Sequence, residues 1–114
     1  MKFMFLVLIP MLFLASCIPQ QTLYTWKDYD VATYNYLKNT DDESVQKLIE
    51  SYRQIISQQN GTRGVVPPGI YADYGFLLIQ EGQINQGKEM LNREIALYPE
   101  SKPFIERILK MLEE

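Results

Sequence analysis

IYADYGFLLIQEGQINQGKEMLNREIALYPES, residues 70–101, predicts the architecture of this chain. Its first part, residues 70–80, is apolar on nearly every side of a helix, which is typical of a helix buried between neighbours. Residues 81–83 (Glu-Gly-Gln) predict a tight turn, and residues 85–98 predict a second helix that Pro99 ends. The stretch therefore predicts a helical hairpin whose first helix lies at the centre of the fold.

Apolar spacing predicts how these two helices pack, because positions three and four apart share a helix face. Helix 70–80 has two apolar faces, one with Tyr71, Tyr74, Leu77 and Leu78 and another with Ala72, Phe76 and Ile79. Around helix 85–98 the positions expected to point inward are Ile84, Gly87, Leu91, Ile95 and Tyr98.

The hairpin resembles a tetratricopeptide repeat, whose pattern has a bulky aromatic residue, a small residue at the helix crossing, a turn glycine, a second small residue and a final proline. Those positions are filled here by Tyr71, Gly75, Gly82, Gly87 and Pro99. Two positions depart from the pattern, since Leu78 replaces an aromatic residue and Glu94 replaces a small one. Glycine within a helix costs about 1 kcal/mol relative to alanine, so we expect Gly75 and Gly87 to allow a close approach of the two helices.

Residues 26–60 predict a second hairpin. Helix 28–38 has a face made of Tyr29, Ala32, Thr33, Tyr36 and Leu37. Thr40 and Glu43 have the spacing of a capping box that begins the next helix. That helix is expected to end near Asn60-Gly61, and its stripe contains Val45, Leu48, Ile49, Tyr52, Ile55 and Ile56.

A last helix is predicted after Ser101, which we expect to cap it. Its apolar stripe contains Phe104, Ile105, Ile108, Leu109 and Leu112. This helix is interpreted either as a core-packing helix or as a docking face, with Met111 off the main stripe. No strand pattern of comparable strength occurs. The predicted fold is all-α, with five helices arranged as two tetratricopeptide-like hairpins and a C-terminal helix.

The N-terminus predicts a lipoprotein. Lys2 precedes an apolar run over residues 3–14, and Leu14-Ala15-Ser16-Cys17 has the pattern of a bacterial lipobox. We expect residues 1–16 to be a signal peptide, Cys17 to be lipidated, residues 17–25 to form a tether and residues 26–114 to form the helical domain. A plain secretory signal, with Cys17 merely a small residue at the cleavage site, is the alternative.

The tether predicts where the domain works. Ile18, and not Asp, follows the lipidated cysteine, which favours sorting to the outer membrane in Gram-negative bacteria. Residues 18–25 extend at most about 27 Å at roughly 3.3 Å per residue, so the domain must lie close to its membrane. If the tether packs on the domain, the domain lies closer still.

Composition excludes several kinds of function. The chain has no histidine and one cysteine, which excludes disulfides within the chain, Cys/His zinc sites and Ser-His catalysis. The net charge of −3 and the scattered Lys and Arg residues argue against nucleic acid as a partner. We expect no enzyme, metal or cofactor; the third-ranked alternative is an enzyme using Asp73 with Glu81 or Glu94.

Three residues are candidates for contact with a partner. Trp26 either fixes the tether to the domain or presents a surface. Tyr34 lies off the apolar stripe of its helix, so it is interpreted either as an exposed interface anchor or as a half-buried tyrosine. Arg63, in a glycine-rich loop, could bind a carboxylate or phosphate or could simply be solvated.

Three further segments are distinctive: Leu23-Tyr24-Thr25-Trp26, residues 67–75 (PPGIYADYG) and residues 97–101 (LYPES). Together they resemble a family of short Gram-negative lipoproteins that is classed only as a domain of unknown function. Members usually have glycine after the tryptophan, where this chain has Lys27. The resemblance implies an outer-membrane lipoprotein whose gene often lies beside genes for a lipoprotein similar to the curli-secretion pore and for another small lipoprotein. It implies no catalytic residues.

These observations predict a lipid-anchored, periplasm-facing adaptor or a subunit of an envelope assembly or export complex. Its expected partners are the bilayer, through acylated Cys17, and another envelope lipoprotein or secretion-pore-like complex. The alternative is a non-enzymatic binder of a peptide, glycan or lipid in a groove near residues 60–69.

Overall fold

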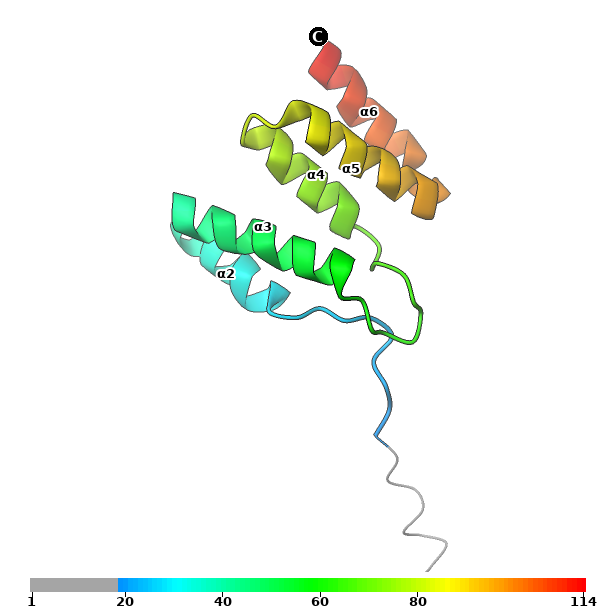
Figure 1. Ribbon diagram of the computed structural model, residues 1–114. Coiled ribbons are helices and arrows are strands. Elements are labelled where there is room, and N and C mark those ends of the chain that lie inside the picture. Colours follow the sequence, from blue (N-terminus) through cyan, green and yellow to red (C-terminus); the bar gives the residue numbers. More distant parts are fainter. Residues whose placement is uncertain (1–18) are drawn as a thin grey trace, which may run out of the picture.

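The computed structural model describes residues 19–114, so the predicted signal peptide and Cys17 lie outside the described residues. The described chain is helical and contains no strand, which confirms the all-α prediction. Five α-helices and one 3₁₀ helix follow one another (Figure 1): α2 (Tyr29–Asn39), α3 (Asp42–Ser57), α4 (Ile70–Gln80), α5 (Ile84–Leu97), η2 (Pro99–Ser101) and α6 (Lys102–Glu113). Over residues 19–114, every helix falls short of the length and apolar character that crossing a bilayer requires.

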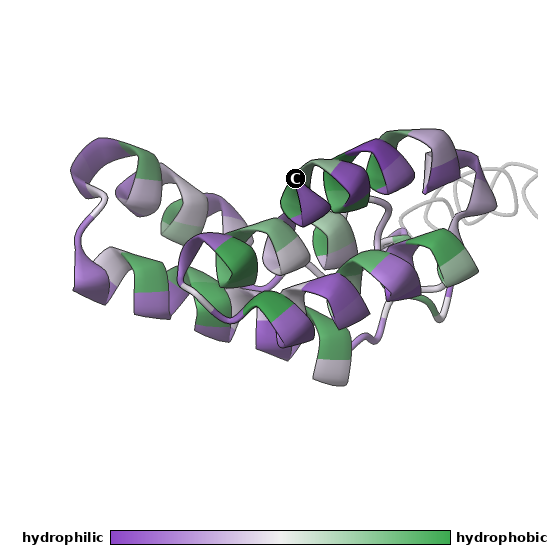
Figure 2. Ribbon diagram, turned by 90° about the horizontal axis from the view of Figure 1, so that it is seen from above, coloured by the Kyte–Doolittle hydropathy of each residue, from purple (hydrophilic) through white to green (hydrophobic). Residues whose placement is uncertain are grey.

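The helices form two hairpins and a final helix. α2 packs against α3, α4 packs against α5, and α4 also contacts α3 (Figure 1). α6 follows α5 and closes a second, smaller core with α4 and α5. Helix α4 therefore lies between the first hairpin and the last two helices, as its apolar surface predicted. Each helix carries both hydrophobic and hydrophilic residues (Figure 2), as expected for helices that bury one face.

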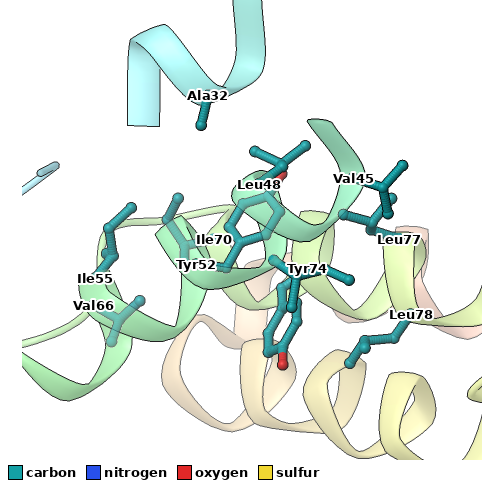
Figure 3. Close-up of a cluster of buried hydrophobic side chains, with 11 residues drawn as sticks. Ala32, Val45, Leu48, Tyr52, Ile55, Val66, Ile70, Tyr74, Leu77 and Leu78 are labelled. Atoms are coloured by element: carbon teal, nitrogen blue, oxygen red, sulfur yellow. The ribbon is translucent and has the colours of Figure 1, made fainter. Parts of the chain in front are cut away.

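The main core joins the two hairpins. Its aromatic part runs from Tyr29 on α2 to Tyr52 on α3 and Tyr74 on α4, with ring centroids 5.7 and 5.5 Å apart. Tyr52 and Tyr74 stack with an angle of 27° between their planes, side by side in Figure 3. The buried members of this core are Ala32, Val45, Leu48, Ile49, Tyr52, Ile55, Val66, Ile70, Tyr74, Leu77 and Leu78.

Gly75 and Gly87 meet where α4 crosses α5. A Cβ atom on Gly75 would lie 2.7 Å from the carbonyl oxygen of Gly87, and one on Gly87 would lie 2.6 Å from that of Gly75. Any larger residue would force the two backbones apart. The expectation that both glycines permit a close approach is confirmed, as is the turn at Gly82, whose φ is 84°.

The capping box of α3 is one residue later than predicted. Asp41 is the N-cap, its carboxylate accepts the N–H of Ser44 at 2.8 Å, and the Ser44 hydroxyl accepts the N–H of Asp41 at 3.0 Å. The predicted Thr40 and Glu43 pair was wrong because Thr40 ends α2 instead. Thr40 has a φ of 40°, and both its N–H and its hydroxyl donate to the carbonyl of Tyr36.

Two other helix ends also differ from the predictions. α3 ends at Ser57, before Asn60, because the residues that follow it bind the N-terminal segment. Ser101 precedes α6 without capping it, since its hydroxyl donates to the carbonyl of Tyr98 at 2.7 Å.

Some residues predicted to face inward are exposed. Leu37 and Phe104 are 74% and 64% exposed, and Phe76, Ile84 and Leu112 are exposed as well. Helical spacing identifies an apolar face, but burial also needs a neighbour of sufficient width. Among the described residues, α6 contacts only one side of the stack, so its broad apolar face is covered over Ile105 and Ile108 and open at Phe104.

Candidate functional site

The N-terminal segment is docked on the loop that joins the two hairpins. The N–H groups of Thr62 and Arg63 donate to the carbonyls of Thr22 and Leu23 at 3.0 and 3.1 Å. The N–H of Asn60 donates to the hydroxyl of Thr25 at 3.0 Å. The second interpretation of the tether, that it packs on the domain, therefore holds for residues 22–25.

Gln59 holds this segment with its side chain. Its amide oxygen accepts the N–H of Thr25 at 2.5 Å, and its amide nitrogen donates to the Thr25 carbonyl at 3.1 Å. The side chain thus replaces a backbone partner. Gly61 permits the contact, because a Cβ atom there would overlap the backbone of Leu23 and Tyr24. No local sequence pattern indicated either role.

Trp26 connects the docked segment to the core. Its ring lies 6.2 Å from the Tyr24 ring, nearly edge-on, and 5.6 Å from the Tyr29 ring, measured between centroids. Tyr29 continues into the Tyr52–Tyr74 stack. Trp26 therefore takes the fixing role predicted for it, and it also remains partly open to solvent.

Glu94 caps a helix other than its own. α4 begins after Gly69, whose φ is 91° and which has no capping side chain. Glu94, on α5 and only 3% exposed, accepts the N–H of Gly69 at 2.7 Å through Oε1. Carboxylates are stabilised at helix N-termini, where backbone N–H groups lack partners. This need explains why Glu94 stands where the repeat pattern has a small residue.

Burial nevertheless raises the pKa of Glu94 above its usual 4.5, although the N–H groups of Gly69, Ala72 and Tyr71 oppose the rise. Burial also raises the pKa of nearby Asp73, whose charge adds to the effect on Glu94. Oε2 of Glu94 has no hydrogen-bonding partner among the described residues. Burial therefore destabilises the charged carboxylate at neutral pH, while the same carboxylate supplies the hydrogen bond that caps α4.

The carboxylates considered for catalysis are not gathered at one place. Asp73 and Glu94 are neighbours at the start of α4, whereas Glu81 follows the last residue of that helix. Eight residues separate Asp73 from Glu81, a rise of about 12 Å along the helix, so Glu81 lies away from the other two carboxylates. Within residues 19–114, no three Asp, Glu, His or Cys side chains are placed to hold a metal ion.

Arg63 lies at the same end of the molecule as Trp26. Its backbone N–H donates to the carbonyl of Leu23. Burial raises the pKa of Tyr98 to about 12, and the exposed positive charge of Arg63 opposes that rise. Tyr98 in turn donates to the carbonyl of Val66 at 2.6 Å, which ties the loop to α5. The two predicted contact residues are thus brought to one end of the molecule.

Tyr34 lies elsewhere, on the outer surface of α2. It is 63% exposed, and the Lys38 ammonium lies 5.9 Å from the centre of its ring. Val31 and Leu37, spaced three residues to either side, are also exposed. We call Val31, Tyr34 and Leu37 the α2 patch. A similar α6 patch consists of Phe104, Met111 and Leu112.

Two shallow concavities were not predicted. One, of about 240 Å³, is polar and lies beside the α2–α3 turn, lined by Asn35, Asn39, Asp41, Glu43, Ser44 and Lys47. The other, of about 290 Å³, is lined by Tyr71, Arg93, Ala96 and Leu97 on α4 and α5. Tyr71, predicted as a repeat-defining residue, is half-buried there. Pro99, another of these residues, begins η2, one residue after Tyr98 caps the end of α5.

Comparison with known proteins identifies the family. No curated protein and no solved structure matches the chain. Residues 23–108 match a family described as a domain of unknown function (DUF4810). The match begins in the docked segment at Leu23 and ends at Ile108 in α6, so it includes both hairpins. The chain belongs to the DUF4810 family.

Proposed function

We propose that this protein is a lipid-anchored adaptor on the periplasmic side of the outer membrane. The lipobox at Cys17 supports the anchor, and Ile18 supports the outer membrane. The paired hairpins support a short tetratricopeptide-like scaffold, a kind of structure that presents helix faces to other proteins. The proposed partner is another envelope lipoprotein, such as a subunit of a secretion-pore-like complex.

The α2 patch is the observation on which the proposal depends. Three apolar side chains lie exposed on one outer helix, and one of them is a tyrosine with a cation beside it. Tyrosine is enriched among the residues that dominate binding energy at protein interfaces. Adjacent exposed apolar residues are typical of a surface that another protein covers.

The alternative, a ligand groove near residues 60–69, has less support. The N-terminal segment already covers Gly61, and Val66 and Pro67 are buried. The proposal assigns no catalytic role to Glu94, because its carboxylate caps α4.

Site-specific photo-cross-linking in cells tests the adaptor. A benzophenone side chain would replace Tyr34, with Phe104 as a second position and exposed Gln46 on α3 as the control. We expect a cross-link from Tyr34 to one envelope lipoprotein and none from Gln46. The proposal is wrong if neither Tyr34 nor Phe104 gives a cross-link above that of Gln46.

A surface substitution provides the quantitative test. Val31→Asp places a charge in the α2 patch without entering the core. We expect the affinity for the cross-linked lipoprotein to fall at least tenfold, which is about 1.4 kcal/mol. Gln46→Asp is the matched control and should leave affinity unchanged. Equal losses in both variants would point to an effect other than contact through α2.

A further inference from the structure

The docked segment fixes where the predicted anchor leaves the domain. Thr22 is paired with Thr62, so only residues 18–21 lie between Cys17 and the docked chain. Five residue steps extend at most about 17 Å. Thr22, which pairs with Thr62 of the loop, is therefore held within that distance of an acylated Cys17.

This end of the molecule carries an exposed and well-supported tip. The loop turns tightly, with the N–H of Gly64 donating to the carbonyl of Gly61 at 3.0 Å and a Gly64 φ of 67°. Leu23, Arg63 and Val65 are exposed there, and Leu23 is 57% exposed. We call these three residues the tip. In Figure 1 the loop lies beside the blue N-terminal segment, at the end where α4 begins.

Contacts within the protein hold the tip. Val66, next to Val65, is buried, and its carbonyl accepts the hydroxyl of Tyr98 at 2.6 Å. Gly69 at the end of the loop is held by Glu94. The exposed side chains therefore project from a fixed support, which makes them suitable for a flat partner.

We infer that the tip lies on the phospholipid headgroups of the bilayer that holds the anchor. This inference rests on the proposed lipid anchor. The headgroup layer of one leaflet is roughly 5–7 Å thick, and the short free segment keeps the tip within reach of it. Leu23 and Val65 enter the apolar side of that layer, and Arg63 pairs with lipid phosphate.

Contact at the tip sets the orientation of the domain. The α4–α5 turn lies at the far end of α4, about 16 Å along the helix from Gly69. The tip therefore faces the bilayer and Glu81 faces water, while the α2 patch on the side of the domain remains open to a partner. A domain joined to its anchor by a long, flexible linker would have no such preferred orientation.

Spin labelling of the lipidated full-length protein tests this orientation. Cys17 is consumed by the lipid, so Val65→Cys and Glu81→Cys each supply one free thiol for a nitroxide. The probe is vesicles of phosphatidylethanolamine and phosphatidylglycerol. The measured quantity is the rate at which the nitroxide collides with oxygen, divided by the rate at which it collides with a water-soluble nickel complex. We expect this collision ratio to be several-fold higher at position 65 than at position 81. Equal ratios would overturn the inference.

Two further measurements separate this inference from the proposed anchor. If flotation with vesicles and the intact mass show no acyl chains, the anchor itself is wrong. If the protein floats and both labels are equally aqueous, only the tip contact is wrong. Arg63→Glu, read from the label at position 65, should lower the collision ratio without changing flotation. An unchanged ratio would remove Arg63 from the contact.

Discussion

Lys27 adopts a left-handed backbone conformation, with φ at 50°, between Trp26 and the start of α2. Residues with a Cβ atom are disfavoured there by about 1–2 kcal/mol, whereas glycine is not. The family resemblance expects glycine at this position. The conformation gives a physical reason for that preference and shows that this chain tolerates a strained lysine.

Lys27→Gly should stabilise the protein. The relief of strain exceeds the added freedom of the unfolded chain, so we expect the free energy of unfolding to rise by about 0.5–1 kcal/mol. Arg107→Gly, at an exposed position in the middle of α6, is the control and should lower it by about 1 kcal/mol. Thermal unfolding followed by circular dichroism measures both. A destabilised Lys27→Gly protein would contradict the strain argument.

Gly75→Ala should destabilise the protein despite the higher helix propensity of alanine. The new Cβ would meet the Gly87 carbonyl at 2.7 Å, and backbone atoms cannot move aside as a flexible side chain can. We expect a loss of about 1–3 kcal/mol of unfolding free energy in chemical denaturation. Gln86→Ala, exposed on α5, should change it by less than about 0.5 kcal/mol. Equal stabilities would mean that the helices can separate freely.

Among the secondary-structure elements, α4 depends on a distant part of the chain, because its N-terminal cap comes from Glu94 on α5. The folded pKa of Glu94 is raised, so the folded protein binds its proton more tightly than the unfolded chain does. The contribution of Glu94 to stability is therefore greatest when the group is protonated. It decreases as the pH rises from about 4.5 through the folded pKa.

Glu94→Gln and Glu94→Ala separate the cap from the charge. Glutamine keeps an acceptor for the Gly69 N–H and removes the buried charge, so we expect unchanged or higher stability at pH 7 and a weaker pH dependence. Alanine removes the acceptor and should lower the free energy of unfolding by about 1–2 kcal/mol. Thermal unfolding between pH 4.5 and 8 tests this. A glutamine variant as unstable as the alanine variant would show that the charge itself is required.

For the protein as a whole, the proposed lipid anchor is the feature that would decide where it acts. We expect the intact mass of the mature protein to correspond to a chain that begins at an acylated Cys17, and expect the protein to stay with membranes after a high-salt wash. Two or more acyl chains bind a bilayer durably. Cys17→Ala should lack the acyl mass. A mature chain with a free thiol at Cys17 would instead support a plain secretory signal.

Several features of the fold were predictable because they are local. Helical periodicity, breaker residues and the turn glycine gave the number of helices and the bounds of α4. The close approach at Gly75 and Gly87 was predictable because only such packing compensates glycine within a helix. The position of Tyr34 off the apolar stripe left two interpretations open, and the structure favours the exposed one, with 63% of the residue accessible.

Other features required distant segments to meet, and the tertiary structure alone decided them. Gln59 pairs with Thr25 across 34 residues, and Glu94 caps a helix 25 residues away at Gly69. Neither leaves a periodic signal. Leu37 and Phe104 have the spacing of core residues and are exposed, because burial depends on how many neighbours a helix has. Local sequence specifies which residues share a helix face, whereas the packing of the helices specifies which faces are covered.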